Sequence, residues 1–227
     1  MLKRYKAFCL VFLMAYLSEL VLRYLKFHVP ALLIQSVVSL MLLAFFVNVT
    51  KLRGRFHKRF FTGMIFMALS DLFFMADVSW FLYALIGFLL GNLFYTRAFY
   101  LDFLSAQELD KRVARIAIAC CSLGSIAFYL YLRPYLGNMK LPVMVYIFVM
   151  AMMLMMSAFR RLRVNEISFN LVFAGALFLA FSDVLLAHFK FVVPLSGSNV
   201  FVGAIYMLAQ FLLVMGAAER KLLSPTP

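Results

Sequence analysis

The chain has 227 residues, of which 66% are hydrophobic and 14% are charged, and its mean hydropathy is +0.99. Soluble domains are about 45–50% apolar and about 25% charged, so this composition excludes a soluble protein and indicates a single integral membrane domain over residues 1–227. The net charge of +13 does not predict a nucleic-acid partner here, because cytoplasmic loops of membrane proteins are rich in Lys and Arg.

Eight apolar runs have the length of about 17–25 residues that a membrane-spanning helix needs. The sequence therefore predicts an all-α, polytopic fold with eight transmembrane helices. The first run is short and contains Glu19, so we expect a tilted or peripheral helix. Only Asp77 to Ser79 separate the third run from the fourth, and Asp77 or Ser79 is expected to cap the fourth helix. The runs lie near residues 7–22, 30–49, 60–76, 79–100, 113–132, 141–158, 167–187 and 199–218.

The distribution of basic residues tests this count. With eight helices, 16 of the 22 Lys and Arg fall on the side of the two termini, and Arg97 lies near that end of the fourth helix. This bias places both termini in the cytoplasm, and merging the third and fourth helices would destroy it. We expect a multi-pass protein of a bacterial cytoplasmic (inner) membrane. The five basic residues on the other side are Arg23, Lys26, Arg133, Lys140 and Lys190.

Two runs share a Ser-Asp pair with a glycine eight residues before the aspartate: Gly63 with Ser70-Asp71, and Gly175 with Ser182-Asp183. An ionisable group inside a membrane helix costs about 2.5–3.5 kcal/mol on insertion scales and marks a functional site by default. Two aspartates in matching contexts predict one polar site within the bilayer.

An offset of 112 residues superimposes these two segments and also places Gly91 on Gly203 and Phe99 on Phe211. Helices 3–4 thus resemble helices 7–8. Because an even number of helices separates the two pairs, this is a possible pseudo-repeat of parallel orientation, as known in transporters.

Further polar residues lie on the returning helices. Asn92 is expected at the depth of Asp71 with Tyr95 and Thr96 on the same face, and Tyr206 at the depth of Asp183 with Gln210 on its face. Interhelical hydrogen bonds, worth about 0.6 kcal/mol each, explain Asn92, Thr96 and Gln210 equally well, and the two tyrosines fit as packed aromatics.

Other side chains are expected to play no part in the chemistry. Ser70 and Ser182 are expected to bond backbone carbonyls rather than act as nucleophiles. The histidines His28, His57 and His188 form no cluster at ligand spacing, so no metal is expected.

The two Gly-…-Ser-Asp segments, the stretch from Gly87 to Tyr95 and the pair Tyr206…Gln210 resemble the YhhN family, whose animal members are lysoplasmalogenases. Many relatives have Gly where this chain has Ser70, and His where it has Asn92. The resemblance implies a hydrolase that cleaves the vinyl-ether bond of lysoplasmalogens to a fatty aldehyde and a glycerophospho-headgroup.

The chemistry that this resemblance implies needs two carboxyl groups. Asp71 and Asp183 would share the roles of proton donor and of stabilising or water-activating carboxylate, as in glycosidases. Which aspartate plays which role stays open. The lipid would enter sideways from the bilayer, and no cofactor is needed. Substrate-binding residues would be Asn92, Tyr95, Tyr206, Gln210, Ser70 and Ser182.

Two other functions are compatible with the same residues. A proton-coupled transporter or lipid translocator would also use paired intramembrane carboxylates. A structural or sensory protein would use them as a polar lock between helices. The sequence does not indicate an oligomeric state.

Overall fold

The computed structural model describes residues 5–76, 80–105, 111–195 and 197–223. Within these ranges the fold is all-α, as predicted, and eight long helices follow one another with two 3₁₀ turns between the fifth and the sixth. The elements are α1 (Lys6–Tyr24), α2 (His28–Thr50), α3 (Gly54–Ala76), α4 (Phe81–Phe103), α5 (Lys111–Leu132), η2 (Arg133–Tyr135), η3 (Gly137–Met139), α6 (Lys140–Ala158), α7 (Glu166–Phe191) and α8 (Ser198–Ala218).

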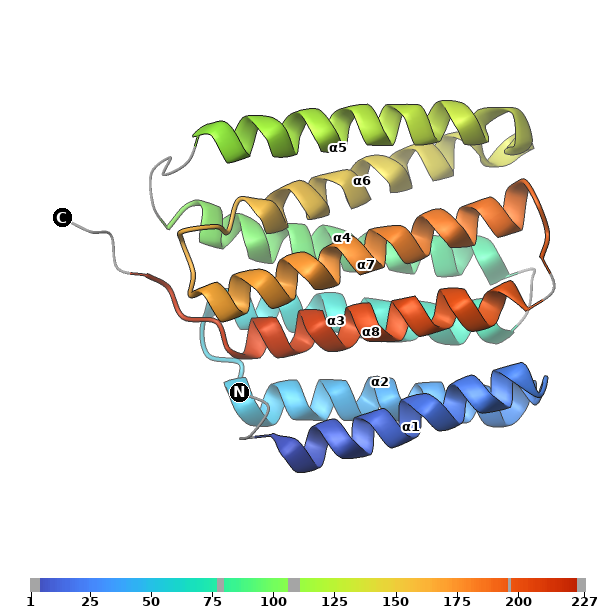
Figure 1. Ribbon diagram of the computed structural model, residues 1–227, viewed down its shortest axis with the longest axis horizontal. Coiled ribbons are helices and arrows are strands. Elements are labelled where there is room, and N and C mark those ends of the chain that lie inside the picture. Colours follow the sequence, from blue (N-terminus) through green and yellow to red (C-terminus); the bar gives the residue numbers. More distant parts are fainter. Residues whose placement is uncertain (1–4, 77–79, 106–110, 196, 224–227) are drawn as a thin grey trace.

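Successive helices run in opposite directions, so α1 begins and α8 ends at the same end of the bundle, on the left in Figure 1. The pair α1 and α2 lies at one edge of the bundle and α5 at the other (Figure 1). The connections between α2 and α3 and between α6 and α7, both rich in Lys and Arg, lie at the end where α1 begins. By the positive-inside rule this is the cytoplasmic end, and the opposite end is called the outer end below.

Seven of the described helices, all except α3, are long and apolar enough to cross a membrane. The first turns of α3 carry Arg55, Lys58 and Arg59, so its apolar part begins only at Phe60. Helix α3 nevertheless packs along α4 within the bundle (Figure 1). This arrangement is that of a polytopic membrane protein.

Some helix boundaries differ from the predicted ones. Helix α3 begins six residues early, at Gly54, because its basic segment continues the helix beyond the apolar part. Helix α4 begins at Phe81 rather than at 79, and the predicted caps Asp77 and Ser79 lie outside the described residues. Helix α7 continues to Phe191, four residues beyond the prediction, so Lys190 lies on the helix and not in a loop.

The glycine that precedes each Ser-Asp pair marks a close helix contact. A Cβ atom on Gly63 would lie 2.7 Å from the ring of Tyr95 and 3.1 Å from the carbonyl oxygen of Gly91, both on α4. A Cβ atom on Gly175 would lie 2.8 Å from the backbone nitrogen of Leu213 on α8. Small residues allow membrane helices to approach closely. The matching glycines therefore permit α3 to pack closely on α4 and α7 to pack closely on α8. The two helix pairs of the possible pseudo-repeat share this feature.

A buried ionic cluster joins the helix ends at the cytoplasmic end. The Asp102 carboxylate accepts hydrogen bonds from Arg160 Nε at 2.7 Å and from Arg220 Nε at 2.7 Å. Asp102 and Arg160 are fully buried. Arg160 also donates to Ser168 Oγ at 3.0 Å, and that hydroxyl donates to the Gly216 carbonyl. Arg160 and Arg220, two of the arginines that produce the charge bias, thus also connect parts of the fold. Arg160 contacts α4 and α7, and Arg220 contacts α4 from the segment after α8.

Candidate functional site

Asp71 lies on α3, five residues before the described helix ends, which is about 7.5 Å from its outer end at 1.5 Å per residue. Its side chain is 7% exposed. Tyr206 of α8 donates its hydroxyl to Asp71 Oδ2 at 3.1 Å, and Gln35 of α2 also forms a side-chain hydrogen bond with this carboxyl group. The sequence predicted Tyr206 at the depth of Asp183, whereas its hydrogen bond goes to Asp71.

A charged pair on α1 completes this region. The guanidinium of Arg23 is bonded to the buried carboxylate of Glu19, one turn earlier on α1, and to the side-chain oxygen of Gln35. Arg23 and Glu19 both lie within electrostatic range of Asp71. Helix α1 is peripheral, as expected, but Glu19 faces the bundle interior. Arg23, which the charge count assigned to the outer side, belongs to the polar site.

Asp183 lies on α7 in a second hydrogen-bonded chain. Asn92 Nδ2 of α4 donates to the Tyr146 hydroxyl at 3.3 Å, and Tyr146 of α6 donates to Asp183 Oδ2 at 2.7 Å. Asn92 is fully buried, and Tyr146 is 8% exposed. Because the Tyr146 proton is directed to the carboxylate, the chain fixes the orientation of the Asp183 side chain.

The remaining predicted residues are buried nearby with other partners. Tyr95 donates its hydroxyl to Gln210 Oε1 at 3.2 Å, and Thr96 donates to the carbonyl of Asn92, one turn earlier on its own helix. Ser70 donates to the Phe66 carbonyl and Ser182 to the Val202 carbonyl, as expected for structural serines.

Both aspartates line one cavity near the outer end, which we call the aspartate cavity. It spans about 440 Å³, including the part that is open to the surroundings. It is lined by Arg23, Gln35, Asp71, Ser182, Asp183 and Tyr206, together with apolar residues of α3, α4, α7 and α8. The expectation of one polar region between the two Ser-Asp helices thus has a geometric counterpart. Helices α1 and α2 contribute to it as well.

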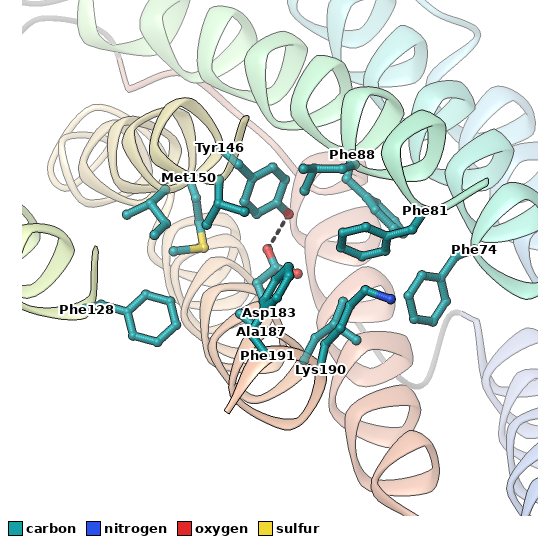
Figure 2. Close-up of a pocket in the computed structure, with 14 residues that line it drawn as sticks. Phe74, Phe81, Phe88, Phe128, Tyr146, Met150, Asp183, Ala187, Lys190 and Phe191 are labelled. Atoms are coloured by element: carbon teal, nitrogen blue, oxygen red, sulfur yellow. Dashed lines mark hydrogen bonds between the residues drawn. The ribbon is translucent and has the colours of Figure 1, made fainter. Parts of the chain in front are cut away.

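A second cavity adjoins the first and is almost wholly apolar. This apolar cavity spans about 540 Å³, including the part that is open to the surroundings, and Figure 2 shows its side chains around Asp183 and Tyr146. Asp183, Phe74, Phe88 and Leu186 line both cavities. Asp183 therefore lies where a polar compartment meets an almost wholly apolar one.

Several of these contacts were not predicted from the sequence. Tyr146 lies in an apolar span without polar neighbours, so nothing distinguished it there. Gln35 lies next to Ser36 in α2, and nothing in the sequence links it to an aspartate on another helix. Glu19 and Arg23 could have been found, because a carboxylate and a guanidinium four residues apart share one helix face.

A metal-binding arrangement is absent from the part of the chain that the structure describes. No three His, Cys, Asp or Glu side chains gather there at a spacing that could hold an ion. The expectation that the protein needs no metal stays a prediction.

The fold and this site define an integral membrane protein with a polar site inside the bilayer and an adjoining, almost wholly apolar cavity. The sequence profile of the YhhN family matches residues 30–217, so this chain belongs to the YhhN family. It is similar to the human protein named "Lysoplasmalogenase TMEM86A", with 28% identity over 167 residues that cover 72% of this chain and 66% of the human protein. The chain thus spans slightly less than two thirds of that relative. No solved structure matches the chain.

Proposed function

We propose that this protein is a lysoplasmalogenase-like hydrolase that cleaves the vinyl-ether bond of a lysoplasmalogen. The observation that carries the proposal is the position of Asp183, which lines both the aspartate cavity and the apolar cavity. A lipid bound in the apolar cavity presents the bond between its headgroup and its chain to Asp183, and Asp71 lies across the adjoining aspartate cavity. The name of the human relative supports the same reaction.

The chemistry proceeds by protonation at carbon. A carboxylic acid gives its proton to the second carbon of the R–CH=CH–O– group, and the positive charge that develops is shared between the first carbon and the ether oxygen. Water then adds to the first carbon and loses a proton to a carboxylate. In the resulting hemiacetal the bond from the first carbon to the glycerol oxygen then breaks. The hemiacetal hydroxyl gives up its proton to one carboxylate as the aldehyde forms, and the glycerol oxygen takes up a proton from the other carboxyl group. The products are R–CH₂–CHO and the free glycerol hydroxyl, with one water consumed.

We assign the proton donor to Asp183 and the carboxylate to Asp71. The hydrogen bonds from Tyr206 and Gln35 and the nearby guanidinium of Arg23 all stabilise negative charge on Asp71. Within the described residues, Asp183 accepts one hydrogen bond, from Tyr146, and it lines the apolar cavity as well as the aspartate cavity. A pair of carboxyl groups in unequal surroundings is the usual way in which one site supplies both an acid and a base.

The other predicted residues have positioning roles in this proposal. Tyr206 orients the Asp71 carboxylate, and Asn92 acts on Asp183 through Tyr146. Gln210 borders another cavity next to Asp71 and is suited to hold the attacking water, while Tyr95 orients Gln210. Ser70 donates to a carbonyl of its own helix and Ser182 to a carbonyl of α8, so neither is assigned to the substrate. A bacterial inner membrane as the location, and a single domain over residues 1–227, belong to the same proposal.

The test measures aldehyde release by the purified protein in detergent from a 1-alkenyl-glycerophospholipid. Asp71→Asn and Asp183→Asn are each expected to lower kcat at least about 100-fold, since a positioned acid or base contributes about 10²–10⁴-fold. Glu166→Gln, at the cytoplasmic end of α7, is the matched control and is expected to retain wild-type activity.

Thermal melting of the same samples separates the alternatives. A wild type that releases no aldehyde, but shows proton-driven lipid flux in liposomes, would replace this proposal with the transporter. If Asp71→Asn lowers the melting temperature and the folded fraction retains full specific activity, the aspartate is a structural lock.

A further inference from the structure

Lys190 of α7 is a cation on the wall of the apolar cavity. It lies two helical turns after Asp183, and both side chains line this cavity. Figure 2 shows the Lys190 ammonium between the rings of Phe81 and Phe74, and its nitrogen lies 3.9 Å from the centre of the Phe81 ring. The side chain is half-buried. The ring of Phe81 therefore holds the charge at the cavity rather than in bulk water.

The charge of Lys190 lacks an anionic partner within the described residues. Arg23, the cation of the neighbouring aspartate cavity, is paired with the carboxylate of Glu19. In the part of the chain that the structure describes, Lys190 forms no ion pair, and its contact with the Phe81 ring does not neutralise its charge. A lysine ammonium is a compact point charge of the kind that binds phosphate. The apolar cavity thus carries one group suited to an anion.

The spacing along α7 fits one part of a lipid. Seven residues correspond to about 10.5 Å along the helix axis and return to nearly the same face. In a 1-alkenyl-glycerophospholipid, five single bonds separate the ether oxygen from the phosphorus. Their summed length is about 7.5 Å at about 1.5 Å per bond, and the zigzag of the bond angles shortens the end-to-end span to about 6 Å. About 4–5 Å remain for the contacts at the two ends, where hydrogen-bonded atoms lie about 3 Å apart. One lipid can therefore reach Asp183 with its vinyl ether and Lys190 with its phosphate.

The orientation of this lipid agrees with its place in a bilayer. Lys190 lies one residue before the outer end of α7, whereas Asp183 lies deeper. Met150, one turn beyond Tyr146 on α6, forms part of the deeper wall of the cavity. A phosphate at Lys190 is thus near the membrane surface, and the chain points toward the membrane centre.

We propose that Lys190 binds the phosphate of the substrate, so that the site takes a 1-alkenyl lysophospholipid in preference to an uncharged 1-alkenylglycerol. This inference rests on the proposed function, and it assigns the residue of that same site that binds the phosphate. Phe81 positions the ammonium, and the two-turn spacing to Asp183 sets the distance between the anchored phosphate and the bond that is cleaved.

The test uses lipids that cannot be cleaved, so that binding is measured without catalysis. Isothermal titration of the purified protein in detergent compares a 1-O-alkyl-glycerophosphoethanolamine with the 1-O-alkylglycerol that lacks phosphate. Lys190→Met, which approximates the length of the side chain, is expected to weaken binding of the phospholipid about 10-fold or more. Lys190→Arg should bind within about threefold of wild type. The alkylglycerol should bind equally to all three proteins.

Aldehyde release is measured in parallel with the cleavable 1-alkenyl phospholipid. Lys190→Met is expected to raise KM by a similar factor and to leave kcat nearly unchanged, since the phosphate is remote from the bond that is cleaved. Thermal melting verifies that the variants are folded.

Each outcome bears on one of the two proposals. Equal phospholipid affinity in wild type and Lys190→Met would overturn the role of Lys190 while leaving the hydrolase intact. An equal loss for both lipids would also overturn it, because the loss would not depend on phosphate. A wild type that releases no aldehyde, yet loses phospholipid affinity through Lys190→Met, would support the phosphate site and refute the hydrolase.

Discussion

The ionic cluster of Asp102, Arg160 and Arg220 at the cytoplasmic end leads to a prediction about the thermal stability of the protein. Asp102→Asn removes the negative charge that two guanidinium groups share, and it leaves the fully buried Arg160 next to Arg220 without this counter-ion. Burial already lowers the pKa of Arg160, and Asp102 opposes this effect by stabilising the charged form. Breaking a buried ion pair from one side costs about 3–5 kcal/mol.

This cost corresponds to a large change in melting temperature. For a chain of about 150–250 residues, each kcal/mol shifts the melting temperature by about 2–4 °C, so Asp102→Asn should lower it by about 6–20 °C. Arg160→Met should cost less, because Arg220 remains to pair with Asp102. The double variant Asp102→Leu with Arg160→Met removes both buried charges and should recover much of the loss.

Thermal melting in detergent, followed by intrinsic fluorescence, measures all three variants. A melting temperature of Asp102→Asn within about 2 °C of wild type, the shift expected for less than about 1 kcal/mol, would refute the reasoning. It would mean that Arg160 reaches water or another anion. A double variant that is less stable than Asp102→Asn would contradict the argument that the unpaired charge is responsible.

The remaining predictions concern the site and the helix contacts. Tyr146→Phe removes the hydrogen bond to Asp183 and is expected to lower kcat about 10-fold or more with little change in KM, as measured by aldehyde release. Gly175→Val forces a side chain against the backbone of Leu213 and should cost at least about 1–3 kcal/mol of stability in thermal melting, whereas Gly124→Val, with open space around it, should melt like wild type.

Much of the fold was predictable because the bilayer restricts what a chain can do. Apolar runs of spanning length become helices, and the excess of basic residues on alternate connections sets their direction. The pairing of Gly63 with Asp71 and of Gly175 with Asp183 predicted the polar site, and both glycines lie at close helix contacts. The boundaries of α3 and α7 were less predictable, because a helix continues past the end of its apolar run when nothing breaks it.

The hydrogen-bond partners of the two aspartates could not be predicted from spacing along one helix. Tyr146 is one of 11 tyrosines, and its contact with Asp183 depends on how α6 packs against α7. Similarly, Tyr206 was placed at the depth of Asp183 by counting residues, but the packing of α8 directs its hydroxyl to Asp71. The spacing of residues along a helix predicts how deep a side chain lies in the bilayer and on which face of its helix. The rotation of neighbouring helices relative to one another decides which group becomes its hydrogen-bond partner.

The position of Tyr206 and Arg220 near the end of the chain has a consequence for biosynthesis. A membrane protein is made from its N-terminus, and its helices are available for packing in that order. Glu19 and Arg23 lie on one helix and can neutralise each other as soon as α1 is made. The hydrogen bond from Tyr206 to Asp71 can form only after α8 has been synthesised. The hydrogen bond from Arg220 to Asp102 can form only after the residues that follow α8 have been synthesised. A ribosome that stops before α8 would therefore release a protein in which both carboxylates are incompletely paired.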